Sequence, residues 1–113
     1  MASDCLFCRI AAGEIPARIV HSDDDVVAFH DISPKAPTHV LVIPRRHLSA
    51  LSATTAADDA LLGRALAATR ELARTLGLAS YRIVVNNGED AGQSVHHLHL
   101  HLLGGRVFGW PPG

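Results

Sequence analysis

A chain of 113 residues is long enough for one domain with a single hydrophobic core, and residues 1–113 are expected to form that one domain. Ten basic residues against eleven acidic ones leave a net charge of −1, which argues against a nucleic-acid or anionic-membrane partner. The sequence has no apolar run of eighteen residues and no basic-plus-apolar leader, so we expect a soluble, cytoplasmic protein.

The first predicted element is a short helix. Its predicted N-cap is Asp4, and it runs to about Ala12 before Gly13 ends it. Cys5 and Cys8 then lie one turn apart on one side of the helix. In a cytoplasmic protein this Cys-x-x-Cys spacing favours a metal site or a redox pair over a structural disulfide. The alternative is a pair of reduced, partly buried thiols without a function.

Three short strands follow, at residues 18–21, 26–30 and 39–43, with residues 22–25 as the turn between the first two. The one long helix is predicted over residues 56–76, where Thr55 and Asp58 give a capping-box pattern. Its apolar face is predicted from residues at helical spacing: Leu62, Leu66, Thr69, Leu72, Ala73 and Leu76. Two further strands, at residues 81–87 and 95–103, complete an α+β pattern with an antiparallel sheet.

Four histidines fall within six residues of the last predicted strand, at positions 96, 97, 99 and 101. Because side chains alternate along a strand, His97, His99 and His101 are expected on one face and the intervening leucines on the other, with His96 on the leucine side and without a role. The outer two are then roughly 13 Å apart, too far to share one zinc ion with bonds of about 2.0–2.1 Å. Imidazoles with a pKa near 6.5 suit a phosphate ester better, although idle, solvated histidines are the alternative.

The segment before these histidines, residues 86–94, contains two glycines, amide side chains and a hydroxyl. Glycine allows backbone N–H groups to approach an anion closely. The segment has no Gly-Lys-Ser/Thr, and a strand rather than a helix follows it, so it is neither a Walker loop nor a dinucleotide fingerprint. It is a candidate phosphate loop, with a plain hairpin loop as the alternative.

The run Gly92-Gln93-Ser94-Val95 followed by His97-Leu98-His99-Leu100-His101 resembles the signature of the histidine triad (HIT) superfamily. The likeness extends through residues 29–34, 37–39, 42–44 and 84–86 and through Gly104-Gly105-Arg106 to the ending Trp110-Pro111-Pro112-Gly113. This ending is similar to the Hint branch of nucleoside phosphoramidases. The resemblance implies a five-stranded antiparallel sheet that dimerises into a continuous sheet. It also implies hydrolysis of purine nucleoside 5′-phosphoramidates through a nucleotidyl-histidine intermediate, with no cofactor needed for catalysis.

The same resemblance assigns roles to particular residues. His99 would be the nucleophile, and the other catalytic residues would be His101, His97, His39 and Ser94. Asp31 would bind the ribose diol, although a turn aspartate is an equally good interpretation on local grounds. The nucleotide pocket would comprise Asp31, Ile32, Asn86, Gly92, Gln93, Ser94, Leu6, Phe7, Ile10 and Phe29, with N–H groups around Gly92 and Gln93 binding phosphoryl oxygens. The apolar members of this set are also typical of an ordinary core.

Cys5 and Cys8 need two more ligands for tetrahedral zinc. His47 and His97 are candidates, because the four residues resemble the zinc set of some bacterial HIT proteins. A metal-bound His97 could not also contact phosphate, which would leave His99 and His101 for the chemistry.

Three other functions stay open: a nucleotide-binding regulatory module, a dinucleoside polyphosphate hydrolase or nucleotidylyltransferase, and a small zinc-binding protein without catalysis. The expected partners are an AMP-like nucleotide and a second copy of the chain. The apolar residues Val107, Phe108 and Trp110 would be buried in the homodimer, with the tail near the partner's site.

Overall fold

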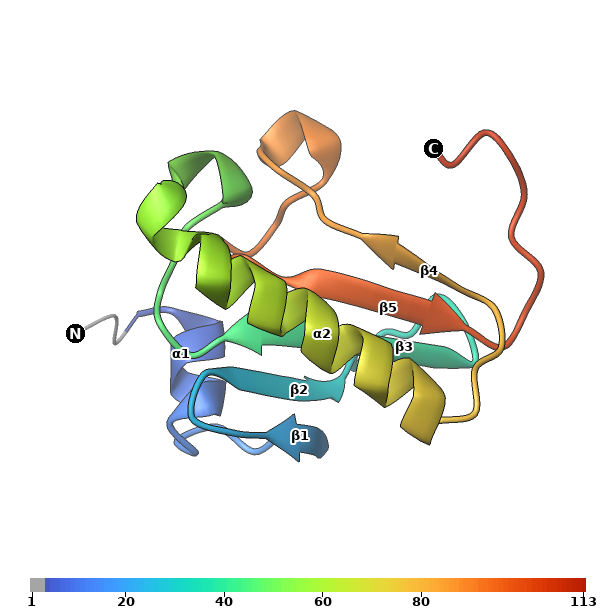
Figure 1. The fold of residues 1–113 in the computed structure, drawn as a ribbon, viewed down its shortest axis with the longest axis horizontal. Coiled ribbons are helices and arrows are strands. Elements are labelled where there is room, and N and C mark those ends of the chain that lie inside the picture. Colours follow the sequence, from blue (N-terminus) through green and yellow to red (C-terminus); the bar gives the residue numbers. More distant parts are fainter. Residues whose placement is uncertain (1–3) are drawn as a thin grey trace.

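The computed structural model describes residues 4–113, and a five-stranded antiparallel sheet forms its centre (Figure 1). The strands lie in the order β1-β2-β3-β5-β4. Their bounds are β1 Ile19–Ser22, β2 Val26–His30, β3 Thr38–Pro44, β4 Tyr81–Val84 and β5 Leu100–Gly104. The helices are α1 Leu6–Ala11 and α2 Asp59–Thr75, with short 3-10 turns at Leu51–Ala53, Ala56–Asp58 and Glu89–Ala91. The predicted α+β class is confirmed.

The two faces of the sheet are covered by different helices, and α2 lies across the face seen in Figure 1. Because side chains alternate along a strand, β3 gives Val40 and Val42 to the α2 side and Leu41 and Ile43 to the other. On that second face, α1 packs Phe7 and Ile10 against Val27, Phe29, Leu41 and Ile43. His99 and His101 lie on this α1 side of the sheet.

The predicted apolar face of the long helix is confirmed at Thr69, Leu72 and Ala73, which are buried, but not in the first half of the helix. Leu61 and Ala65 face the sheet in place of Leu62 and Leu66, and Leu66 is 52% exposed. The small Ala65 side chain lets the helix approach the sheet closely, which leaves the bulkier leucines on its flank. The capping box is confirmed, since Asp58 Oδ2 accepts from the Thr55 N–H at 2.9 Å, but it opens a 3-10 turn that leads into α2.

Two strand boundaries differ from the prediction. β4 ends at Val84 and β5 begins only at Leu100, so His97 and His99 precede the strand. The reason is that the Leu98 N–H donates to the Leu48 carbonyl of a loop, at 2.6 Å, instead of to a neighbouring strand. Strict alternation therefore fails there, and the side chain of His96 is exposed beside Glu89 rather than facing the leucine side.

The start of α1 also differs from the prediction. Its N-cap is Cys5 rather than Asp4, with the Cys5 sulfur accepting from the Cys8 N–H at 3.4 Å. A sulfur acceptor can replace a carboxylate here because the N–H groups of the first turn need only one nearby lone pair.

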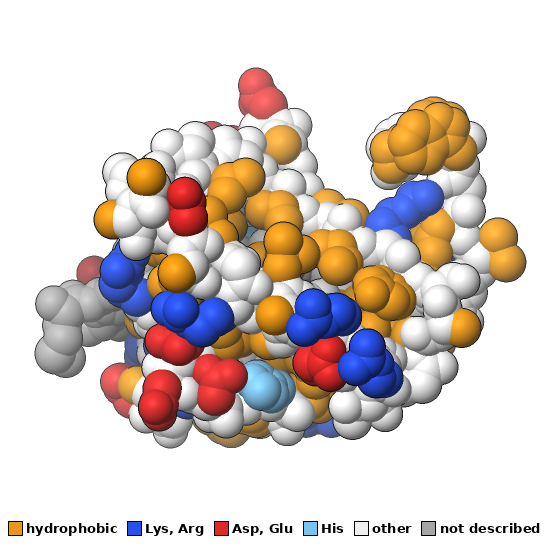
Figure 2. Space-filling model, viewed as in Figure 1, with side chains coloured by type: hydrophobic (Ala, Val, Ile, Leu, Met, Phe, Trp, Pro, Cys, Tyr) orange, Lys and Arg blue, Asp and Glu red, His pale blue; other side chains and the backbone are white. Residues whose placement is uncertain are grey.

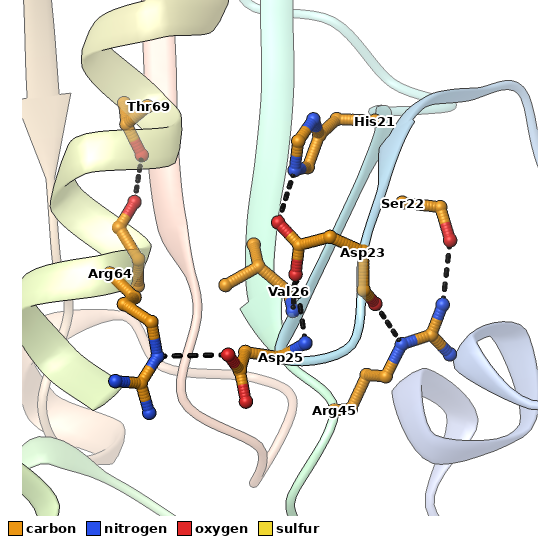
Figure 3. Close-up of polar contacts among 9 residues, drawn as sticks. His21, Ser22, Asp23, Asp25, Val26, Arg45, Arg64 and Thr69 are labelled. Carbon is orange, nitrogen blue, oxygen red and sulfur yellow. Dashed lines mark hydrogen bonds and ion pairs between the residues drawn. The ribbon is translucent and has the colours of Figure 1, made fainter. Parts of the chain in front are cut away.

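Side-chain hydrogen bonds stabilise the predicted turn between β1 and β2 (Figure 3). Asp23 Oδ1 accepts from the N–H groups of Asp25 and Val26, both at 2.8 Å. Arg45, just after β3, donates to the Asp23 carbonyl at 2.6 Å and to the Ala11 carbonyl at the end of α1 at 2.9 Å. These contacts tie α1 to the sheet edge, and thereby fix the wall that α1 contributes to the cavity described below.

At the opposite end, the chain leaves β5 and projects from the body as a tail (Figure 1). Val107 is 92% exposed and Trp110 is 85% exposed. Within residues 4–113, no helix has both the length and the apolar character needed to span a bilayer.

Candidate active site

A cavity of about 410 Å³ opens on the α1 face of the sheet. Its polar lining consists of His30, Asp31, Ser94, His99 and His101. Its apolar lining contains the predicted Leu6, Phe7, Ile10, Phe29 and Ile32, together with Ile15, Pro16, Ala17, Leu41 and Val95, which the sequence analysis did not single out. Leu41 was detectable, because it lies two residues after His39 on the same strand face.

The ring of His99 is held in one tautomer by the backbone. Its Nδ1 lies 2.7 Å from the carbonyl oxygen of His97, and a carbonyl can only accept, so Nδ1 carries the proton. Phe7 packs edge-on against the ring at 5.1 Å between centroids and fixes its plane. The Nε2 lone pair of His99 is therefore available to the cavity as a nucleophile.

A series of hydrogen bonds also fixes the positions of the ring protons of His39 and His101. The backbone N–H of Lys35 donates to His39 Nδ1 at 3.0 Å, so the neutral His39 ring carries its proton on Nε2. That Nε2–H donates to His101 Nδ1 at 2.9 Å, which leaves the His101 proton on Nε2. Among the buried side-chain atoms of residues 4–113, His101 Nε2 has no hydrogen-bond partner. A buried donor of this kind is stabilised by a ligand that accepts from it.

Both rings are neutral at physiological pH. Burial lowers the pKa of His101 to about 4, with further lowering from the charges of His99 and His39 and opposition from Asp31. Burial also lowers the pKa of His39; the Asp31 carboxylate opposes this shift, and Lys35 adds to it. Because both rings are neutral, each carries a single N–H, and the direction of donation set by the Lys35 N–H is maintained from His39 to His101.

Asp31 lines the cavity and lies beside His39. One carboxylate oxygen accepts from the Ser33 N–H at 2.7 Å, and the other lies 3.5 Å from His39 Nε2. The side chain therefore serves the turn after β2, as local chemistry predicted, and also lines the cavity. Both interpretations of this residue are compatible with its position.

The candidate phosphate loop is held together by its own hydrogen bonds. The N–H of Gly92 donates to the Glu89 carbonyl at 2.9 Å, and that of Gln93 to the Gly88 carbonyl at 3.0 Å. The buried Gln93 side chain donates to the Ser49 and Val95 carbonyls. Gly92 has a φ of +96° and leaves room for Asn86, whose amide nitrogen would lie 3.7 Å from a Cβ there. The group from this loop that lines the cavity is Ser94.

Four predicted metal ligands do come together, although they come from three separate parts of the chain. The ligand atoms of Cys5, Cys8, His47 and His97 lie within 4.8 Å of one another. Both imidazoles present Nδ1, with 3.2 Å between the two nitrogens and 3.3 Å from each nitrogen to its nearest sulfur. A tetrahedral zinc ion with bonds of about 2.0–2.3 Å sets its ligand atoms about 3.3–3.8 Å apart. The donor set fits such an ion.

His97 belongs to this cluster rather than to the cavity. Its side chain is fully buried, and its Nε2 donates to the Pro44 carbonyl at 2.8 Å, which leaves the Nδ1 lone pair facing the two sulfurs. Burial, together with the neighbouring Cys5, raises the pKa of the Cys8 thiol to about 11. The thiolate form of Cys8 therefore needs a cation beside it. Because the backbone carbonyl of His97 also holds His99, one residue joins the cluster to the cavity.

The chain is similar to known proteins in both sequence and structure. The HIT domain family matches residues 12–108. An uncharacterized HIT-like protein of Synechocystis is 54% identical over 114 aligned residues that cover all of both chains. The crystal structure of a HIT family hydrolase from Legionella pneumophila matches with a TM-score of 0.95 and 49% identity, covering 96% of this chain and 99% of the other. A histidine triad nucleotide-binding protein from Candida albicans matches with a TM-score of 0.80 and 33% identity, covering 95% and 82%.

Proposed function

Since the chain belongs to the HIT family, we propose that it is a Hint-like hydrolase of purine nucleoside 5′-phosphoramidates, which releases AMP and an amine. The observation that carries this proposal is the pair of opposed ring nitrogens at the cavity. His99 offers an Nε2 lone pair and His101 an unpaired Nε2–H, with 4.9 Å between the ring centroids. A nucleophile beside a fixed donor is what displacement at phosphorus requires.

The cavity suits a nucleoside monophosphate group. The apolar wall of Phe7, Ile10, Phe29 and Leu41 would hold a purine base by packing, and the remaining lone pairs of the Asp31 carboxylate would accept from the ribose hydroxyls. The phosphoryl group would then reach His99, His101 and Ser94. Because Gly92 and Gln93 use their N–H groups within the loop, we assign oxygen binding to Ser94 and His101.

The reaction proceeds in two displacements. His99 Nε2 attacks the phosphorus, the P–N bond to the amine breaks, and the amine takes up a proton that Ser94 or His101 can relay. Water then attacks the nucleotidyl-histidine, which returns His99 and releases AMP. Removing one fixed donor from such a site typically costs about 3–4 kcal/mol of transition-state stabilisation.

The lining of the cavity argues against the two nucleotide alternatives. None of its described side chains is Lys or Arg, which disfavours a dinucleoside polyphosphate with its longer row of charges. A regulatory module that only binds AMP has no need of a nucleophilic nitrogen held in one tautomer. A single phosphoryl group with a leaving amine fits the neutral histidines best.

We also propose that the Cys5, Cys8, His47 and His97 cluster binds structural zinc. The donor geometry supports this assignment, and the ion would hold α1 to the segments around His47 and His97. When bound, it supplies crosslinking and no chemistry at the phosphoryl group.

A second copy of the chain is the proposed partner, paired through the edge strand β4. Tyr81 and Val85 are exposed at this edge, and Leu66 is exposed on the neighbouring flank of α2. Figure 2 shows hydrophobic side chains in a band along that flank and charged ones along the opposite side. Pairing two β4 edges would cover the band and make a continuous sheet.

In the deciding experiment, the protein is incubated in parallel with an adenosine phosphoramidate, a dinucleoside polyphosphate and AMP, and the cleavage of each compound is measured. We expect only the phosphoramidate to be cleaved rapidly. The His99→Gly variant should bind AMP but lose at least about 10³-fold in kcat. His96→Ala is the matched control, because His96 is exposed and outside the cavity. Equal losses in the two variants would refute the assignment of the nucleophile.

A further inference from the structure

Arg106, in the tail just after β5, contacts the loop that precedes His39. Its Nε and Nη2 both lie 3.2 Å from the carbonyl oxygen of Lys35. The guanidinium also lies over the Phe108 ring, 4.2 Å from its centroid. The ring holds the planar group in position, so that its two N–H groups converge on one acceptor.

The Lys35 residue is thereby held at both of its polar backbone atoms. Its carbonyl accepts from Arg106, and its N–H donates to His39 Nδ1 at 3.0 Å. The loop is packed against the tail at a second point, because a Cβ on Gly105 would lie 2.8 Å from Pro37 Cβ. The path of the tail therefore determines where the Lys35 N–H points.

That direction matters for the ring that faces the phosphoryl group. If the Lys35 N–H turned away, His39 could carry its proton on Nδ1 and present an Nε2 lone pair to His101. His101 would then be protonated on Nδ1, and its Nε2 would become an acceptor. An acceptor at that place repels a phosphoryl oxygen instead of binding it.

We propose that Arg106 is a positioning residue that sets the tautomers of His39 and His101 through the Lys35 backbone. This role rests on the proposed function for its catalytic meaning, but the tautomers exist whether or not the chain is an enzyme. Arg106 touches neither ring, so it acts only through the loop.

The test measures the ring protons directly. Two-bond proton–nitrogen correlation spectra of the histidine-labelled full chain report which ring nitrogen is protonated. In the wild type we expect the Nε2–H form for both His39 and His101. In Arg106→Ala we expect a mixture of tautomers at these two rings, with His99 unchanged because the His97 carbonyl still holds it.

Arg82→Ala is the matched control. Arg82 also lies over Phe108, at 5.2 Å, and donates to the Gly109 carbonyl at 2.7 Å, but Lys35 is not among its partners. Unchanged rings in Arg106→Ala, or the same change in both variants, would overturn the proposal. Should Arg106→Ala fail to fold, Arg106→Lys retains the charge without the paired donors, and a partial shift of the same two rings is expected.

Kinetics add an independent readout. For Arg106→Ala, kcat on an adenosine phosphoramidate is expected to fall about tenfold, the equivalent of one hydrogen bond, while affinity for adenosine, which has no phosphoryl group, stays unchanged. A loss of adenosine affinity with constant kcat would contradict the positioning role. If the wild type cleaves no phosphoramidate, the proposed function fails, and the ring spectra still decide whether Arg106 sets the tautomers.

Discussion

Two backbone groups, the His97 carbonyl and the Lys35 N–H, decide what the histidines of the site can do. An unconstrained imidazole exchanges its proton between two nitrogens, so neither is reliably a nucleophile or a donor. The His97 carbonyl fixes the His99 proton on Nδ1. The Lys35 N–H fixes the His39 proton on Nε2, and the bond from His39 then fixes the His101 proton on Nε2 as well. As a result, His99 and His101 present complementary nitrogens to the same cavity without any change in overall charge.

The lowered pKa of His101 predicts a pH dependence of folding. In the unfolded chain the ring takes up a proton as the pH falls below its ordinary pKa of 6.5, while the folded ring stays neutral down to about 4. The unfolded state thus binds more protons in this window, so the free energy of unfolding should decrease as the pH falls from 6.5 towards 4. Thermal melts across this range measure the effect.

The control for this prediction separates His101 from the other groups. His101→Gln should flatten the slope between pH 6.5 and 4, whereas His96→Gln should leave it as in the wild type, because His96 is exposed. Some slope will remain, since burial lowers the pKa values of His39 and His97 as well. An unaltered slope in His101→Gln would contradict the assignment of this ring as buried and neutral.

At the level of the elements, the sequence predicted the existence and type of all five strands and both helices, because turn residues and periodicity are local signals. It failed where a tertiary contact ended an element. The bond from Leu98 to Leu48 removes residues 95–99 from the strand and turns His97 away from the cavity. No spacing within the histidine run could have revealed that, since the partner lies 50 residues earlier.

The candidate metal cluster likewise depends on three separate parts of the chain meeting, and its removal gives a second prediction. The double variant Cys5→Ser, Cys8→Ser should contain no zinc, whereas the wild type should contain about one ion per chain by elemental analysis. Binding only to the folded state stabilises it by about 2.7 kcal/mol when free zinc is 100 times the dissociation constant. For a chain of this size that corresponds to a melting temperature lower by about 10 °C or more.

His96→Ala serves as the metal control, because it changes an exposed histidine of the same run and should keep the ion. The link through His97 adds a further expectation: the metal-free variant should lose activity by misplacing His99, while the base and ribose contacts persist. A wild type that is purified without metal and melts equally with and without added zinc would refute the site.

For the whole molecule, the topology explains why the flank of α2 nearest β4 is apolar while the opposite flank is charged. Arg64 on α2 pairs with Asp25 of the β1–β2 turn at 2.9 Å, so this flank of the helix faces β1. Leu66, two residues on, lies on the opposite flank, towards the free edge of β4. The predicted apolar face concealed this arrangement, since it placed Leu66 in the core of the monomer.

The last prediction concerns assembly. We expect the protein to sediment as a dimer at micromolar concentration, and Leu66→Asp to dissociate it by placing a charge in the buried band. Arg64→Ala, on the other flank, should leave the dimer intact. Trp110 is 85% exposed in the tail beyond β5, and in the proposed dimer this tail would reach the twin subunit's cavity from its leaving-group side.

Deleting residues 110–113 should therefore change the preference among amines more than the affinity for AMP, because the proposed base and ribose contacts lie within one subunit. Relative kcat/KM values for a series of amines, beside the dissociation constant of AMP, measure this difference. A chain that sediments as a monomer while fully active, or a truncated chain with the same amine preference, would show that each cavity is complete within its own subunit. The exposed band would then need another partner.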